Sequence, residues 1–133
     1  MDSAAARDFA LRFLHLMEER NLDAAEALVA PDARIVFPGG KVFASQRDMV
    51  AASKGRYQWI KKRIEQVDAF QNDNGDWIVY VIGTLYGAST SGTAFENIRF
   101  IDRFTLHEDL IIAQEVWNDL AESGALESPT PPR

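Results

Sequence analysis

The sequence contains no cysteine, which excludes a disulfide framework, thiolate chemistry and a cysteine-based metal site. Its two histidines, His15 and His107, have no second ligand at metal-binding spacing, so we expect no metal and no other cofactor. No apolar run approaches the roughly 20 residues of a membrane-spanning helix. The first residues are acidic, and an amphipathic pattern begins within a few positions of the N-terminus, so they do not match a signal peptide. We therefore expect a cytoplasmic protein without a membrane partner.

Basic residues are also in the minority. The 133 residues include 14 Lys and Arg against 20 Asp and Glu, giving a net charge of −6, which opposes binding to nucleic acid. We interpret the basic run Lys61-Lys62-Arg63 as a solvated helix end and strand start. Hydrophobic residues make up 47% and charged residues 26%, as is usual for one globular domain of this length.

The first sixty residues have mainly helical periodicity. Apolar residues three and four apart predict helices over residues 3–20 and 22–29, and a third from about Ser45 to Trp59. Pro31-Asp32 breaks the pattern before a short predicted strand, Ala33–Phe37, which Pro38-Gly39-Gly40 closes.

Beyond Trp59 the pattern alternates and predicts four strands: Lys61–Gln71, Trp77–Ala88, Ile98–His107 and Leu110–Asn118. Short loops join them, so they form an antiparallel meander whose apolar face must be covered by the helices. The expected fold is α+β, with three N-terminal helices packed into a curved, mostly antiparallel sheet. We expect one domain over residues 1–120 and a flexible proline-rich tail over residues 121–133.

One carboxylate interrupts an otherwise apolar strand face. Asp102 lies between Phe100 and Phe104 on the alternating face of the predicted strand Ile98–His107. An ionised carboxylate there must be paired, protonated or beside a wet cavity. It is therefore either a pocket acid with a raised pKa or a structural partner of Arg34 or Arg99. Register across the following hairpin is not fixed by the sequence, so Gln114 or Glu115 is its expected neighbour.

The predicted strand Trp77–Ala88 is apolar on both faces. In a sheet with one face in water, apolar and polar residues would alternate along this strand. A second surface must therefore cover the outward face of the strand. The short tail is a poor cover, and we expect a homodimer formed through the sheet.

The order of three helices, a short strand between the second and third, and a four-stranded meander resembles the nuclear transport factor 2-like, or cystatin-like, α+β cone. The resemblance covers residues 3–120 and is closest to the SnoaL-like branch, which also includes ketosteroid isomerase. It rests on Asn21-Leu22-Asp23-Ala24-Ala25 with Leu28, Pro31-Asp32-Ala33, Phe37-Pro38-Gly39-Gly40, Ile101-Asp102-Arg103-Phe104, and Asp109 through Trp117 with Asp119. It implies a cone with an interior pocket.

Asp102 falls where ketosteroid isomerase keeps a protonated aspartate. The positions of that enzyme's general base and oxyanion tyrosine would be Phe37 and Phe13, which cannot perform these roles, so steroid isomerisation is not expected. The limonene epoxide hydrolase pattern of Arg and Asp two apart also fails, because Arg99 and Asp102 are three apart. In SnoaL-type cyclases one acid–base aspartate acts alone, which the resemblance implies for Asp102.

Two functions follow as hypotheses. In the first, the chain is a cofactor-independent isomerase, cyclase or lyase acting on a small apolar carbonyl compound, with Asp102 as proton carrier. In the second, it is a non-catalytic ligand-binding or assembly module. The residues expected to line the cone are Phe13, Phe37, Trp59, Phe100 and Phe104, with Gln114 and Asn118 orienting the substrate.

Overall fold

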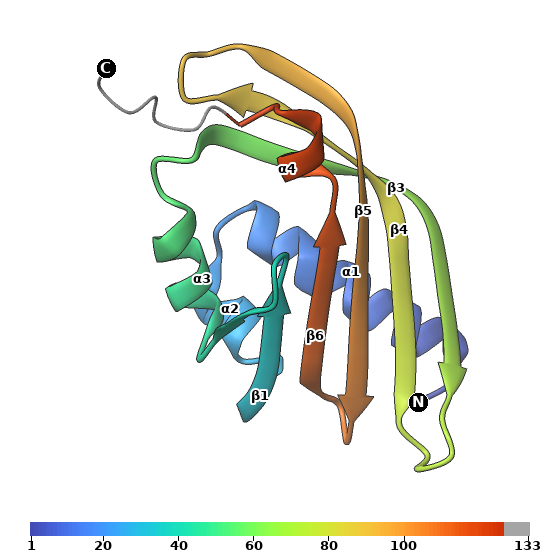
Figure 1. Cartoon of the computed structure of the whole chain (residues 1–133). Coiled ribbons are helices and arrows are strands. Elements are labelled where there is room, and N and C mark those ends of the chain that lie inside the picture. The colour runs from blue at the N-terminus through green and yellow to red at the C-terminus, as the bar shows by residue number, and fades with distance from the viewer. Residues whose placement is uncertain (127–133) are drawn as a thin grey trace.

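A computed structural model describes residues 1–126 of the chain, and the last part of the expected tail, residues 127–133, lies outside the described residues. Helices and a six-stranded sheet with the strand order β2-β1-β6-β5-β4-β3 make up the fold (Figure 1). All neighbouring strands are antiparallel except β1 and β6. The elements are α1 (Ser3–Glu18), α2 (Leu22–Glu26), β1 (Val29–Phe37), β2 (Lys41–Phe43), α3 (Gln46–Ser53), β3 (Tyr57–Gln71), β4 (Trp77–Ser89), β5 (Ala94–His107), β6 (Leu110–Asn118) and α4 (Leu120–Ser123).

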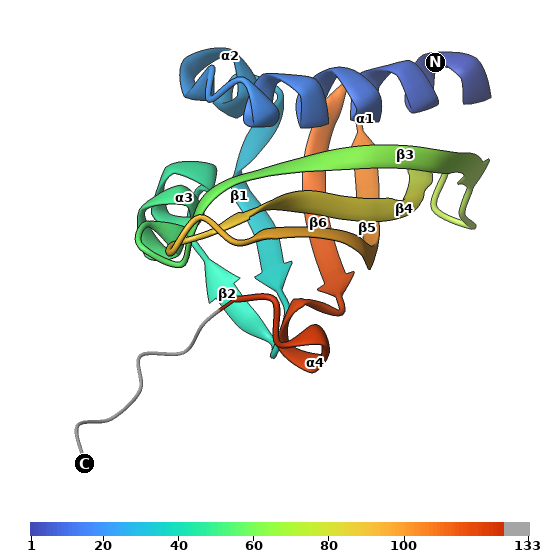
Figure 2. The same ribbon diagram turned by 90° about the horizontal axis from the view of Figure 1, so that it is seen from above.

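Helix α1 covers one face of the sheet (Figure 2). It begins at Ser3, as predicted, and Asp2 is its N-cap: the Asp2 carboxylate accepts a hydrogen bond of 2.8 Å from the amide of Ala5. Its buried residues follow helical spacing and form one stripe: Ala6, Ala10, Phe13, Leu14 and Met17. The small alanines let the helix approach β3 and β4 closely, and their apolar side chains join the core.

The third helix is shorter than predicted. It ends at Ser53, two residues before Gly55, whose φ of +83° is a left-handed conformation that favours glycine. Strand β3 then begins at Tyr57, so Trp59 lies on a strand and not at the end of a helix.

Strand β1 is longer than predicted and includes Pro31. Its register against β6 shifts between Val29 and Arg34, so the proline lies in an irregular stretch where a missing amide is tolerated. Strand β2 was not predicted, because three residues are too short to show alternation.

Two glycines on β4 allow the long strands to bend. A Cβ atom on Gly83 would lie 1.9 Å from the carbonyl oxygen of Arg63, and one on Gly87 would lie 2.1 Å from that of Trp59. The register of β3 against β4 shifts beside both positions, between Ile64 and Gln66 and between Tyr57 and Trp59. Bulges opposite glycine increase strand bending, and in Figure 1 the upper parts of β3, β4 and β5 curve over towards α3.

The predicted α+β class is therefore confirmed: N-terminal helices pack on a curved, mostly antiparallel sheet that does not close into a barrel. Within residues 1–126, no helix has the length and apolar character needed to cross a bilayer.

Candidate functional site

The curvature of the sheet encloses a cavity of about 770 Å³. Its wall is formed by the last turns of α1, the β1–β2 hairpin, α3, α4 and the inward faces of β3, β5 and β6. The inward side chains of the strands alternate with outward ones, so every second residue of β5 and β6 contributes to the wall.

Asp102 lies in this wall in the middle of β5. It is paired in register with Val81 of β4 and Val116 of β6, and its exposed fraction is 1%. Its Oδ1 atom has no hydrogen-bond partner among the described residues. Burial raises the pKa of the Asp102 carboxyl above its ordinary value, and the positive charge of Lys62 opposes this shift.

The expected alternative, an ion pair with an arginine, is not formed within residues 1–126. The Nε atom of Arg99 instead donates to Oδ2 of Asp119 at 2.5 Å on the outside of the protein. Asp102 is therefore a buried carboxyl without a cationic partner, and its neutral form can act as a hydrogen-bond donor.

A pair of buried amides lies in the same wall. The Nε2 atom of Gln46 donates to Oε1 of Gln114 at 2.7 Å, although the two residues are 68 positions apart. Gln46 is the first residue of α3 and is held there by Ser45, whose hydroxyl accepts a hydrogen bond from the amide of Asp48. The Oε1 atom of Gln46 is buried without a partner in the described part of the chain. Such an atom is unfavourable unless a ligand or water reaches it.

Lys62 brings a positive charge into the cavity wall. It pairs with Leu85 on the inward face of β3, and its Nζ atom lies 5.4 Å from the centre of the Phe100 ring. At this distance the ammonium interacts favourably with the ring. Three more cations complete the wall nearer to solvent: Arg20, Lys41 and Arg56.

The other expected site residues are distributed over three places. Phe37, Phe100, Gln114 and Asn118 are in the cavity wall together with Asp102. Phe13 and Phe104 are buried in the core, where their rings meet edge to face with centres 5.6 Å apart. Trp59 is 43% exposed and packs against Tyr86, and it is not part of the wall.

Sequence reasoning missed Gln46 and Lys62. Lys62 stands two residues after Ile60, which also lines the cavity, so alternation along β3 was the available signal. Reading the basic run as a helix end concealed it. Gln46 follows a recognisable helix cap, but nothing local indicates that its side chain meets Gln114.

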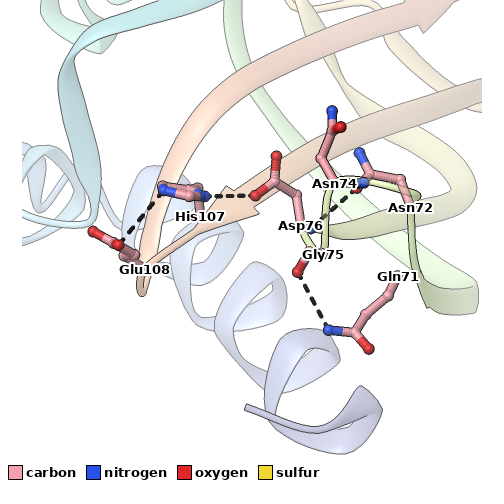
Figure 3. Close-up of polar contacts among 7 residues, drawn as sticks. All are labelled: Gln71, Asn72, Asn74, Gly75, Asp76, His107 and Glu108. Carbon is pink, nitrogen blue, oxygen red and sulfur yellow. Dashed lines mark hydrogen bonds and ion pairs between the residues drawn. The ribbon is translucent and has the colours of Figure 1, made fainter.

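A second polar cluster joins two hairpins at the other end of the long strands (Figure 3). The Nδ1 atom of His107 lies 2.6 Å from Oδ1 of Asp76, and Nε2 lies 3.7 Å from Oε1 of Glu108. The hydrogen bond that the His107 imidazole donates to Asp76, and the negative charge of Asp76, raise the pKa of His107. Asp76 is itself held by Asn72, whose Oδ1 accepts from the Asp76 amide at 3.0 Å. No group of three metal-binding side chains occurs within residues 1–126.

The fold is shared with solved structures that are distant in sequence. TerC, crystallised with polyporic acid, is 17% identical with a TM-score of 0.74, and the match covers 91% of this chain and 97% of TerC. A nuclear transport factor 2-like protein from Burkholderia pseudomallei is 14% identical with a TM-score of 0.74, covering 91% and 96%. A candidate SnoaL-like polyketide cyclase from a Jannaschia species is 17% identical with a TM-score of 0.67, covering 97% and 99%.

No protein with a curated description matches the sequence. The sequence profile of the SnoaL-like domain matches residues 10–114, which is most of the chain and includes the C-terminal half of α1, Asp102 and Gln114. The chain therefore belongs to the SnoaL-like domain family of the nuclear transport factor 2-like superfamily.

Proposed function

We propose that the protein binds a small, largely apolar carbonyl compound in its cavity and moves a proton on it with Asp102. The observation that supports this most is the environment of Asp102: a carboxyl 1% exposed, without an ion-pair partner among the described residues and with a raised pKa, in the wall of a large cavity. A perturbed titratable group in a concave site is the usual mark of acid–base function.

In the proposed reaction, the neutral carboxyl of Asp102 donates its proton to the carbonyl oxygen of the ligand. The other carboxyl oxygen accepts a proton from the neighbouring carbon, so an enol forms and Asp102 ends as it began. In a ligand whose enol is conjugated with a second double bond, the reverse transfer at the far carbon gives an isomer. In a ligand with a second carbonyl, the enol carbon attacks that carbonyl carbon and closes a ring: the new C–C bond replaces the π bond of the second carbonyl, whose oxygen takes up the proton that the enol oxygen releases. Gln46, held by its hydrogen bond to Gln114, orients the ligand through its Oε1 atom, which has no partner in residues 1–126. Phe37 and Phe100 exclude water.

A non-catalytic binding module is the second candidate. It is favoured by the composition of the wall, because the only other carboxylates there among residues 1–126 are Glu18 and Glu122, both outside the strands that hold Asp102. In this case Asp102 serves only as a hydrogen-bond donor to the bound ligand.

Hydrogen exchange on a simple ketone separates the two candidates. 2-Tetralone in deuterated buffer exchanges protons next to its carbonyl, and proton NMR follows the rate with and without protein. Catalysis by Asp102 predicts a faster exchange than in buffer, which Asp102→Asn reduces by about 10²-fold or more. Asp119→Asn removes an exposed carboxylate and serves as the control with unchanged exchange.

Binding of 2-tetralone to the parent protein without faster exchange would favour the binding module. Equal acceleration by the parent and by Asp102→Asn would contradict the role of Asp102.

We also propose that two copies associate through the outward face of the sheet. Ile82 of β4, Ile101 of β5 and Trp117 of β6 lie side by side in register across three strands. Ile101 is 37% exposed and Trp117 is 50% exposed. Charged pairs flank this row, among them Arg103 with Glu115. An apolar centre with a polar rim is the usual composition of an interface.

A further inference from the structure

The cavity wall is electropositive in an otherwise acidic chain. It carries the four cations Arg20, Lys41, Arg56 and Lys62, whereas its carboxylates are Glu18, Glu122 and the buried Asp102. The whole chain has a net charge of −6. Burial favours the neutral form of Asp102, so this carboxyl provides little negative charge to balance the cations.

In the described part of the chain these cations also lack carboxylate partners. Within residues 1–126, none of the four cavity cations forms an ion pair, while four arginines elsewhere each pair with a carboxylate: Arg47, Arg63, Arg99 and Arg103. The guanidinium of Arg20 is occupied by neutral acceptors, the carbonyl oxygen of Met17 at 2.6 Å and the hydroxyl of Tyr57 at 3.4 Å.

Lys62 is the cation closest to the candidate reacting group. Its side chain is half-buried on the inward face of β3, over the ring of Phe100, and Phe100 is two residues from Asp102 on the same face of β5. Within residues 1–126 Glu18 forms no ion pair with this ammonium, and its carboxylate instead accepts a hydrogen bond from the backbone amide of Lys62. A partly desolvated ammonium without a counterion is a favourable site for an anionic group.

We propose that the ligand of this cavity is an organic anion, an apolar carbonyl compound carrying a carboxylate or an equivalent negatively charged oxygen group, and that Lys62 binds this group. The inference rests on the proposed binding of a carbonyl compound in the cavity and specifies its charge. With the anionic group at Lys62, the adjoining atoms of the ligand lie against Phe100 and Asp102. The exposed Arg56 and Lys41 attract the anion towards the cavity.

Two probes of nearly equal shape test the charge preference. 2-Naphthoate is an anion at neutral pH, and 2-acetylnaphthalene is the neutral ketone with the same ring system. We expect calorimetry on the full chain to show binding of both, with 2-naphthoate about tenfold tighter, which corresponds to about 1.4 kcal/mol. The preference decreases at high salt because ions screen the partly exposed charge.

Lys62→Met and Lys61→Met are a matched pair of variants. Lys61 pairs with Tyr86 on the outward face of the same strand, whereas Lys62 faces the cavity. Lys62→Met is expected to abolish the difference between the affinities for 2-naphthoate and for the ketone, both measured on the same variant. Lys61→Met is expected to change neither affinity. The salt dependence of the parent protein tests the charge preference without a substitution, and the two variants test which lysine causes it.

Equal affinities of the parent for the two probes would overturn the anion preference and leave the proposed carbonyl-binding function intact. An anion preference that survives in Lys62→Met would overturn the role of Lys62. If neither probe binds, both this inference and the proposed function are contradicted.

Discussion

The buried Asp102 carboxyl in the cavity wall has a raised pKa and an oxygen without a hydrogen-bond partner in residues 1–126. Because the folded-state pKa lies above the unfolded value of about 3.9, the folded protein holds this proton more tightly. The resulting stability is fully present below that unfolded value and is lost as pH rises through the folded-state pKa. Each unit by which the pKa is raised corresponds to about 1.4 kcal/mol.

Asp102→Asn keeps the size of the side chain and removes the titration. We expect this variant to be at least as stable as the parent at pH 7, with a difference that shrinks as pH falls towards 4. Urea unfolding of both proteins over this pH range measures the difference between their free energies of unfolding. Asp119→Asn, which breaks the exposed ion pair with Arg99, is the control and should lose at most about 1 kcal/mol. A large loss of stability in Asp102→Asn would show that the carboxylate is structural.

At the scale of elements, the cavity depends on the bending of β3 and β4. Gly83 leaves room for the carbonyl of Arg63, which a Cβ atom would meet at 1.9 Å. Gly83→Ala must therefore push β3 away, and we expect a loss of about 1–3 kcal/mol in the free energy of unfolding. Thr84→Ala, on the outward face of the same strand, is expected to lose about 1 kcal/mol or less. Chemical denaturation of the two variants checks this, and an equal loss in both would contradict the close approach.

The contact between His107 and Asp76 joins the β3–β4 hairpin to the end of β5. The hydrogen bond that His107 donates to Asp76 raises the pKa of His107, so the contact stabilises the fold fully below the unfolded value of about 6.5. This contribution is lost as pH rises through the folded-state pKa.

NMR titration of the His107 imidazole is expected to give a midpoint above 6.5 in the parent and a lower one in Asp76→Asn. Thermal unfolding of the parent relative to Asp76→Asn should show a smaller advantage at pH 8.5 than at pH 6. The same midpoint in both proteins would exclude Asp76 as the cause.

For the whole molecule, the outward apolar row predicts a dimer. Light scattering at micromolar concentration should give about twice the chain mass of 14.9 kDa. Ile101→Asp places a charge between Ile82 and Trp117, and it should give a monomer with an unchanged circular dichroism spectrum. A parent protein that is monomeric under these conditions would contradict the dimer.

The order of elements and the α+β class were predictable because they depend on local patterns. The alternation of side chains in residues 98–107 predicted that Asp102 shares a strand face with Phe100 and Phe104. In the structure all three lie on the same face of β5. Local patterns were less informative at boundaries. The third helix was extended to Trp59 because its apolar residues continued at helical spacing past Gly55, where the chain turns into β3. The cytoplasmic location stays a prediction.

The sequence by itself determined that a carboxylate would interrupt an apolar strand face, since this requires only the period of two along a strand. Only the tertiary structure decided that Asp102 has no ion-pair partner within residues 1–126, that Gln46 meets Gln114, and that Lys62 and Asp102 line the same cavity. These contacts join residues far apart in the chain, and they depend on strand register, on the bend at Gly83 and on the position of α3. A pKa or a binding preference follows from burial and partners in space, which no local pattern specifies.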